Sequence, residues 1–240
     1  MTVPLSTFDA FSNDVLKQVG PAELQKIAAR STREELKRGT ELVDEWAAPA
    51  RIWMPLGQSM IALSVTIGGG DRVTVGTIGS NGLFGPTLSA SQFSLHAAKV
   101  MVSGHFLTID REWLSTSLAE LEEFRGAVLR YHAFLLNCLL RNYACNSRHS
   151  LAQRCSRRLL ELSSHARSTE IALRQEDLAT LLSVGRSFVN RTIIALKRDG
   201  LIRTSRECIV IADPDGLKKI ACGCQAGIDQ AYRLAHRRPA

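Results

Sequence analysis

The stretch from residue 174 to residue 211 restricts the fold more than any other part of the chain. Residues 175–182 and 186–197 fit two helices, and only residues 183–185 are left to join them. Residues 203–211 then read as a strand, a polar turn and a second strand. Two helices with a tight turn, followed by a hairpin, predict a winged helix-turn-helix.

The two predicted helices carry the residue types that this motif needs. Ala179 is small enough to let the helices cross closely, and apolar side chains would hold the second helix against the first. These packing residues are Leu178, Leu182, Val184, Val189, Ile194 and Leu196. The turn position that usually prefers glycine is Ser183, where a positive φ would cost up to about 1 kcal/mol.

Polar residues cover the outward face of the second helix at its N-terminal end, where such a helix enters the major groove. They are Arg186, Ser187, Asn190 and Arg191. Arginine can bond guanine O6 and N7, and asparagine can pair with adenine N6 and N7. Gln175, at the start of the first helix, and Arg206, in the hairpin turn, are placed to contact phosphates. The alternative is a small helical bundle whose polar face is only solvated. Such a bundle does not require all of these features at once.

Basic residues are concentrated in the C-terminal part of the chain. Residues 1–144 hold 13 Lys and Arg against 14 Asp and Glu, whereas residues 145–240 hold 17 against 9. The part of the chain that contains the predicted helix-turn-helix therefore accounts for the whole formal net charge of +7. This is the distribution expected of a domain that meets a polyanion.

The N-terminal half follows a different pattern. Residues 11–38 read as a short helical segment, broken at Gly20-Pro21. From residue 39 to residue 109, β-prone runs alternate with glycine-rich turns, and the segment from Gly68 to Asp71 is a hairpin signal between two such runs. Several runs of this kind without an intervening helix predict an antiparallel sandwich or barrel.

A long helical pattern extends from residue 111 to residue 141, and a second helical stretch covers residues 146–166. Apolar residues of the first pattern recur in steps of three and four, close to a heptad seam. They are Leu114, Leu118, Leu121, Val128, Leu135 and Leu139. The periodicity fits a helix packed on its own domain and a dimerisation helix equally well.

The segment LRQEDLATLLSVGRSFVNRTIIALKRDGLI, which ends at Ile202, resembles the helix-turn-helix of the Crp/Fnr family of bacterial transcription regulators. The resemblance implies an α+β fold with four parts. These are an antiparallel β-roll of the cyclic-nucleotide-binding type at residues 1–110, a dimerisation helix at 111–145, a winged-helix DNA-binding domain at 146–224 and a C-terminal tail at 225–240. Residues 231–240 of this tail are basic, and we expect them to be frayed. The resemblance also implies a homodimer on a palindromic operator in double-stranded DNA, and it allows a contact with RNA polymerase.

Carried over position by position, the family's base-contacting residues fall on Arg186, Ser187 and Arg191. The family often has a glutamate where this chain has Ser187. That glutamate accepts a hydrogen bond from cytosine, whereas serine can bond to more than one base and so does not select one. Residues 144–162 and the late Cys222-Gly223-Cys224 resemble a subgroup of the family. The positions that recur in this subgroup are Cys145, Asn146, His149 and Arg154, together with the late pair of cysteines.

The sequence disfavours two known effectors of the family. Members that bind cyclic nucleotides use a glutamate for the ribose and an arginine for the cyclic phosphate. Here Pro86 replaces the acid, and no arginine lies between Gly82 and Lys99, so a buried phosphate would lack a cationic partner. Iron–sulfur sensing of the Fnr type is excluded because no cysteine precedes Cys138. We therefore predict no cofactor and an effector other than cyclic AMP.

All six cysteines lie in the second half of the chain, and in a cytosolic protein they should be reduced thiols. Cys145 and His149 share one helical face, and Cys222 and Cys224 could reach them if the C-terminal part folds back. The four residues could then form a tetrahedral metal site or a thiol redox sensor. The alternative is that they are buried cysteines and a histidine with structural roles.

Other classes of protein are disfavoured. No apolar run approaches the roughly 18 residues that span a bilayer, and the N-terminus does not resemble a signal peptide, so a cytoplasmic protein is expected. An enzyme is not expected, because a cupin-like metal site would have only His96 and His105 as ligands.

We expect a signal to act on the β-roll or on the hinge at residues 142–149. The alternative is constitutive DNA binding without an effector.

Overall fold

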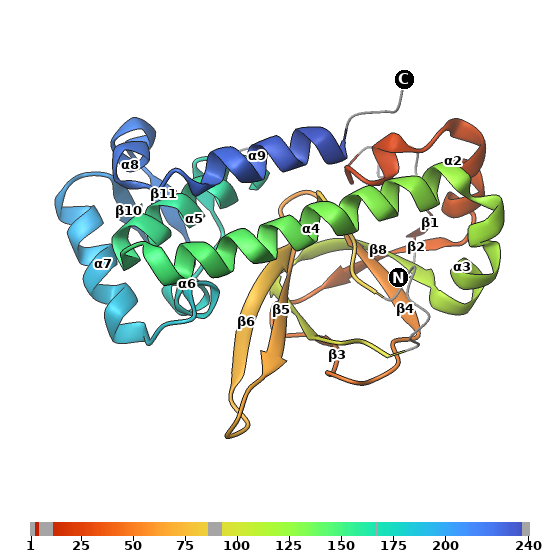
Figure 1. The fold of residues 1–240 in the computed structure, drawn as a ribbon, viewed down its shortest axis with the longest axis horizontal. Coiled ribbons are helices and arrows are strands. Elements are labelled where there is room, and N and C mark those ends of the chain that lie inside the picture. Colours follow the sequence, from red (N-terminus) through yellow and green to blue (C-terminus); the bar gives the residue numbers. More distant parts are fainter. Residues whose placement is uncertain (1–2, 5–11, 86–92, 167, 237–240) are drawn as a thin grey trace.

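The computed structural model describes residues 3–4, 12–85, 93–166 and 168–236. These residues form a β-roll, a long helix that lies across it and a winged helix-turn-helix at the far end of that helix (Figure 1). The α+β class and the predicted order of the parts are confirmed. No helix in the described ranges is long and apolar enough to cross a bilayer.

The described strands of the β-roll form two antiparallel four-stranded sheets. The first has the order β1 (Val3–Pro4), β2 (Ser31–Leu36), β8 (Gly104–Asp110) and β4 (Arg51–Pro55). The second has the order β3 (Glu41–Val43), β7 (Ala97–Val102), β5 (Met60–Thr66) and β6 (Arg72–Ile78). The predicted glycine-rich hairpin joins β5 to β6, with Val65 opposite Val73.

The strand β2 lies inside the segment for which the sequence predicted helix. Residues 16–18 are a 3-10 helix, η1 (Leu16–Gln18), and Pro21–Ala28 form α2, but Ser31–Leu36 pair along their whole length with β8. The run of Glu34, Glu35 and Leu36 favours helix locally. Pairing with a distant strand overrides that preference, because the ladder supplies hydrogen bonds that the local sequence does not encode.

The core of the β-roll lies between the two sheets and is closed by helices. Ile52, Met54, Ile61 and Phe106 from the strands are fully buried. Phe124, Ala127, Val128 and Tyr131 from the long helix belong to the same apolar cluster. The N-terminal half of the long helix is therefore part of the β-roll domain.

The predicted helix over residues 111–145 is interrupted. Arg111–Ser117 form α3, Leu118–Glu120 form the 3-10 helix η2, and the long helix α4 (Glu122–Arg148) begins only after Leu121, whose φ and ψ are −114° and 63°. The carboxylate of Glu23 accepts hydrogen bonds from the N–H groups of Glu123 (3.1 Å) and Phe124 (3.0 Å). A side chain about a hundred residues away thus caps α4, and no local sequence signal reveals such a cap.

This interruption changes the predicted dimer seam. Leu114, Leu121 and Val128 are exposed to 1% or less and lie in the core of their own protomer, so their assignment to the dimer interface is wrong. Leu118 and Leu135 are half-buried against the same core. Leu139 is also half-buried, beside Gly76 of β6. For Leu114, Leu121 and Val128, packing on their own domain is the correct interpretation.

The winged domain has a core of its own. Its elements are α5 (Leu151–Ala166), β9 (Glu170–Ile171), α6 (Gln175–Leu182), α7 (Arg186–Arg198), β10 (Ile202–Thr204), β11 (Ile209–Ile211) and α8 (Pro214–Ile220). The predicted wing is confirmed, because β10 and β11 pair in antiparallel with Ile202 opposite Ile211. Met60, Ala62, Met101 and Val102 from the β-roll join this core, so the two domains share apolar contacts.

The predicted C-terminal tail contains a helix, α9 (Cys224–Ala235), which lies along α4 in Figure 1. The prediction of a frayed segment is therefore wrong for residues 231–235. Ile228 and Ala235 are buried in the core of the β-roll. The ring of Tyr232 lies 5.7 Å from that of Phe134, and its hydroxyl group is 2.5 Å from a carboxylate oxygen of Asp14. The spacing of Ile228, Tyr232 and Ala235 is helical, and this signal could have predicted a docked helix.

Candidate nucleic-acid interface

The turn between α6 and α7 has the predicted geometry. Ser183 has a φ of +52° and a ψ of +47°, which is the left-handed conformation that glycine normally supplies. Its hydroxyl donates a hydrogen bond of 2.9 Å to the carbonyl of Thr74 in β6. Ala179 is buried where the two helices meet, as predicted. The β-roll therefore supports the strained residue of the turn.

The apolar side of the motif differs from the prediction at one position. Leu178, Leu182, Val189 and Leu196 are buried, and Val184 is half-buried. Ile194 is 57% exposed, so its assignment as a packing residue is wrong. Ile193 is buried in its place. Steps of four and three from Val189 lead to residues 193 and 196, and this periodicity identifies the correct isoleucine.

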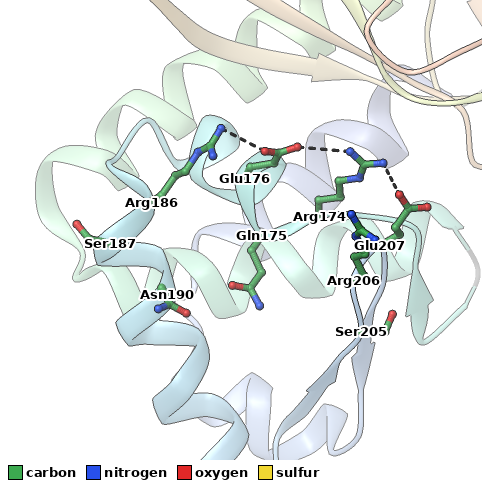
Figure 2. A pocket seen from close by; sticks show the side chains of 9 residues that line it. All are labelled: Arg174, Gln175, Glu176, Arg186, Ser187, Asn190, Ser205, Arg206 and Glu207. Carbon is green, nitrogen blue, oxygen red and sulfur yellow. Dashed lines mark hydrogen bonds and ion pairs between the residues drawn. The ribbon is translucent and has the colours of Figure 1, made fainter.

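A groove of 630 Å³ lies between α6, α7 and the wing (Figure 2). Five of the six predicted DNA-contacting residues line it: Gln175, Arg186, Ser187, Asn190 and Arg206. Figure 2 shows Gln175 projecting between Asn190 of α7 and Arg206 of the wing. Three elements that are separate in the sequence thus present donors and acceptors to one concave surface.

The sixth predicted residue, Arg191, does not line this groove. It is exposed on α7, and its guanidinium carbon lies 4.7 Å from the centroid of the Phe188 ring. A cation above an aromatic face is attracted by the ring quadrupole, which restricts the arginine to one side of the helix.

Glu176 links the groove to the β-roll, and no sequence pattern identified it. Its carboxylate lies 3.2 Å from the guanidinium of Arg186, 3.6 Å from that of Arg174 and 2.7 Å from that of Arg38 (Figure 2 shows the first two). Hydrogen bonding to Arg38 is the main cause that lowers the pKa of Glu176. Arg38 also lies 2.6 Å from Asp177.

The other lining residues that the sequence did not identify are Arg174, Ser205 and Glu207. Arg174 forms an ion pair with Glu207, which joins the start of α6 to the wing (Figure 2). The two residues are 33 positions apart, so no spacing rule predicts their contact.

The hinge between α4 and the winged domain contains the residues that recur in the resembled subgroup. One nitrogen of Arg154 donates to Asn146 at the end of α4 (2.8 Å) and to the carbonyl of Leu182 at the end of α6 (3.3 Å). This side chain therefore connects the long helix directly to the helix-turn-helix.

The four residues considered as metal ligands do come together. The sulfur atoms of Cys145 and Cys222 are 3.4 Å apart, and the sulfur of Cys224 is 3.6 Å from Nδ1 of His149. Burial raises the pKa of the Cys145 thiol. Outside this cluster, burial raises the pKa of Cys138 and Cys155 to about 12, so these two thiols are unreactive at neutral pH.

Three residues of the β-roll segment were considered in the sequence analysis as parts of a nucleotide or metal site. Pro86, in the altered nucleotide cassette, lies outside the described residues. His96 is half-buried before β7, and His105 is exposed on β8. Neither histidine belongs to a group of three or more potential metal ligands in the part of the chain that the structure describes.

Comparison with known proteins agrees with this geometry. Residues 153–220 match the family model of the Crp-like helix-turn-helix domain. No curated protein sequence matches the chain significantly. FixK2 from Bradyrhizobium japonicum has a similar fold, with a TM-score of 0.70 and 15% identity over 80% of this chain and 98% of that chain.

Two further regulators have the same fold. A CRP-family transcriptional regulator from Thermus thermophilus has a TM-score of 0.66 and 16% identity over 78% of this chain and 95% of that chain. The c-di-GMP responsive regulator CLP from Xanthomonas campestris has a TM-score of 0.63 and 16% identity, over 80% and 99% of the two chains. These matches confirm the Crp/Fnr resemblance of the sequence.

Proposed function

The chain has a Crp-like helix-turn-helix domain and the fold of Crp/Fnr regulators, and we propose that it is a homodimer that reads a palindromic DNA operator. The observation that carries this proposal is the groove. Side chains from the start of α6, the exposed face of α7 and the wing converge on it. A convex duplex fits such a surface, with α7 in the major groove and the wing over the backbone.

The side chains that line the groove have distinct roles in this proposal. Arg186 bonds guanine and Asn190 pairs with adenine, because both residues can make two hydrogen bonds to one base edge. Gln175 and Arg206 contact phosphates and fix the register of the protein on the duplex. The ion pair of Arg186 with Glu176 holds the guanidinium at the groove before DNA arrives.

An exposed apolar stripe on α4 supports the dimer. It comprises Leu129, Leu136, Leu140 and Tyr143, which are between 56% and 77% exposed. Together with the exposed Ala133 they follow steps of four, three, four and three residues, as in a coiled-coil seam. A second copy of α4 is the partner that such a stripe fits. This face replaces the seam that the sequence analysis predicted.

The proposed signal acts through α4 and its hinge. A shift of the paired α4 helices changes the orientation of the winged domains through the Arg154 contacts, and thereby the distance between the two α7 helices. Binding to two successive major grooves requires a spacing of about one DNA turn, roughly 34 Å. The effector is one other than cyclic AMP, and the signal must bind the two arrangements with different affinity.

Selection from random duplex DNA at near-physiological salt tests the DNA-binding proposal. We expect a two-fold symmetric motif whose half-sites are about one turn apart. Arg186→Ala should abolish the enrichment, because it removes a groove-lining arginine. Arg198→Ala is the matched control, since Arg198 is an exposed arginine at the other end of the same helix, paired only locally with Asp199.

Enrichment by the purified protein alone would mean that it binds DNA without an effector. If enrichment appears only after a cell extract is added, an effector is required. An asymmetric motif would contradict the dimeric arrangement. Equal loss with Arg186→Ala and Arg198→Ala, or no motif under either condition, would contradict the proposed groove.

Sedimentation analysis tests the dimer separately. Leu140→Glu should convert the protein to a monomer, because it places two like charges at the proposed seam. Leu234→Glu on α9 is the control, since Leu234 is 62% exposed and Leu140 is 61% exposed. A monomeric wild-type protein, or the same mass for both variants, would contradict the proposed seam.

A further inference from the structure

Two separate parts of the fold bring a cluster of potential metal ligands together. Cys145 lies in the last turn of α4, and His149 is the residue that ends this helix. Cys222 and Cys224 flank Gly223 at the junction of α8 and α9. Sγ of each cysteine and a ring nitrogen of the histidine all lie within 4.8 Å of one another.

The distances suit a tetrahedral centre. For a zinc–sulfur bond of about 2.3 Å, the edge of a regular tetrahedron of ligand atoms is about 3.8 Å. Two of the pairs are at 3.4 Å, between the sulfur atoms of Cys145 and Cys222, and at 3.6 Å, between Sγ of Cys224 and Nδ1 of His149. Only small shifts of the remaining side chains are needed to close the set around one ion.

The donor set selects the class of metal. Three thiolates with one imidazole favour a borderline-soft divalent ion such as Zn²⁺, and they exclude Mg²⁺ and Ca²⁺, which take oxygen ligands. Two of the cysteines, Cys145 and Cys222, are buried, and His149 and Cys224 are half-buried. Four protein ligands leave no open position, which is the pattern of a structural rather than a catalytic site.

Buried charge next to the cluster also favours a metal ion at this site. Arg157, Arg158 and Glu161 are all buried and joined by bonds of 2.9 Å, so this triad carries one net positive charge. The Arg157 guanidinium lies beside the thiol of Cys145. One divalent ion with three thiolates has a net charge of −1. Such a centre would neutralise the triad, and buried charges are stable only when they are paired.

We propose that Cys145, His149, Cys222 and Cys224 bind one Zn²⁺ ion per chain, which fastens the α8–α9 junction to the hinge end of α4. The site is separate from the DNA groove, and the proposal goes beyond the proposed function. By closing a loop of 77 residues between Cys145 and Cys222, the ion holds α9 and the winged domain at the end of the long helix.

A disulfide between Cys145 and Cys222 is the competing use of the same residues. It would leave Cys224 and His149 without a role, whereas a metal ion uses all four ligands. A disulfide also carries no charge of its own, so it would not interact with the buried triad as a negatively charged metal centre would. The two arrangements are distinguished by the metal content and by the number of free thiols.

Metal content and cobalt spectroscopy on the full-length protein test the proposal. Purified without a chelator, the protein should contain about one equivalent of zinc by mass spectrometry. After the metal is removed under reducing conditions, Co²⁺ should produce the ligand-field bands of a tetrahedral ion and a thiolate charge-transfer band. Cys145→Ser and the pair Cys222→Ser with Cys224→Ser should abolish both signals, and His149→Cys should retain them because it keeps four ligands.

Cys208→Ser is the matched control, since Cys208 lies in the wing, beside Glu170, and is not part of the cluster. It should bind zinc like the wild type. Circular dichroism confirms that each variant is folded. No metal and no cobalt spectrum in a folded protein with free thiols would overturn the proposal. A Cys145–Cys222 disulfide in the protein purified from the cytoplasm, or equal loss of metal with Cys208→Ser, would also overturn it.

Operator binding by the metal-free protein is measured in parallel. A metal site without operator binding would contradict only the proposed function, and operator binding without a metal site would contradict only this inference.

Discussion

Glu176 contacts three arginines that come from three parts of the chain. Arg186 belongs to the recognition helix, Arg174 precedes α6, and Arg38 follows β2 in the β-roll. A single carboxylate therefore orients the side chain that we propose contacts a base, and ties it to the β-roll. Its position in the first turn of α6 is also where the helix dipole favours an acid.

The identity of residue 187 determines how specific the proposed half-site is. We predict that Ser187→Glu creates a preference for cytosine at one position of each half-site, because glutamate accepts a hydrogen bond from the amino group of cytosine. The expected discrimination is about 1–3 kcal/mol per half-site. Selection with both proteins measures it. Ser187→Ala is the control and should leave that position unselective, whereas an unchanged motif in Ser187→Glu would mean that residue 187 does not reach a base.

Gly82 is a residue whose small size the core requires. A Cβ added at this position lies 2.2 Å from the ring of Tyr131, a buried residue of α4. We predict that Gly82→Ala destabilises the protein by about 1–3 kcal/mol, the range for overpacking a core. Thermal or denaturant unfolding measures the change. Gly68→Ala should be nearly neutral, since nothing lies within 4 Å of its added Cβ, and equal effects of the two changes would contradict the packing argument.

Among the elements, α4 shows how a distant residue sets the end of a helix. The periodicity of residues 111–141 continues through Leu121 without a break. Glu23 nevertheless caps the chain at Glu123 and Phe124, so α4 begins there and α3 takes another direction. This is the physical reason that the buried leucines before the break were mistaken for part of a dimer seam.

Helix α9 is an integral element of the fold and not a tail. We predict that Ile228→Ala lowers the free energy of unfolding by about 2–5 kcal/mol, because it leaves a cavity at a side chain that is 3% exposed. Leu234→Ala on the same helix should change stability by less than about 0.5 kcal/mol, since Leu234 is largely exposed. Chemical denaturation compares the two variants. A neutral Ile228→Ala would mean that α9 does not dock on the β-roll.

In the whole molecule, several contacts couple the sensor domain to the winged domain. Arg38 reaches Glu176 and Asp177, Arg154 joins the end of α4 to α6, and α9 runs from the wing side to the β-roll (Figure 1). These contacts connect the β-roll and α4 to the helix-turn-helix. The proposed control by an effector requires such a connection.

The salt dependence of operator binding reports on the assembled dimer. We predict that Arg206→Ala makes the slope of log K against log salt concentration shallower by about 1.8, because a dimer loses two phosphate contacts at about 0.9 each. Titrations at several salt concentrations measure the slope. Arg233→Ala removes the same charge from an exposed position on α9, outside the groove, and should leave the slope unchanged. A change of about 0.9 would indicate that only one protomer contacts DNA through its wing.

The sequence alone determined the parts whose signals are local. The hairpin of β5 and β6, the two helices of the helix-turn-helix with its left-handed Ser183, and the wing all follow from turn residues and apolar spacing within a few positions. Most of the groove residues could be named for the same reason, because the outward face of α7 is set by its own periodicity.

Only the tertiary structure decided which of these surfaces meet. The pairing of β2 with β8, the cap that Glu23 gives to α4, the link from Arg38 to Glu176 and the gathering of Cys145 with Cys222 each join residues far apart in the chain. A periodic pattern states that one face of a helix will be buried, but it does not state against what. That choice depends on the packing and hydrogen bonding of the whole molecule, which is why the face of α4 that remains free for a partner could be identified only from the fold.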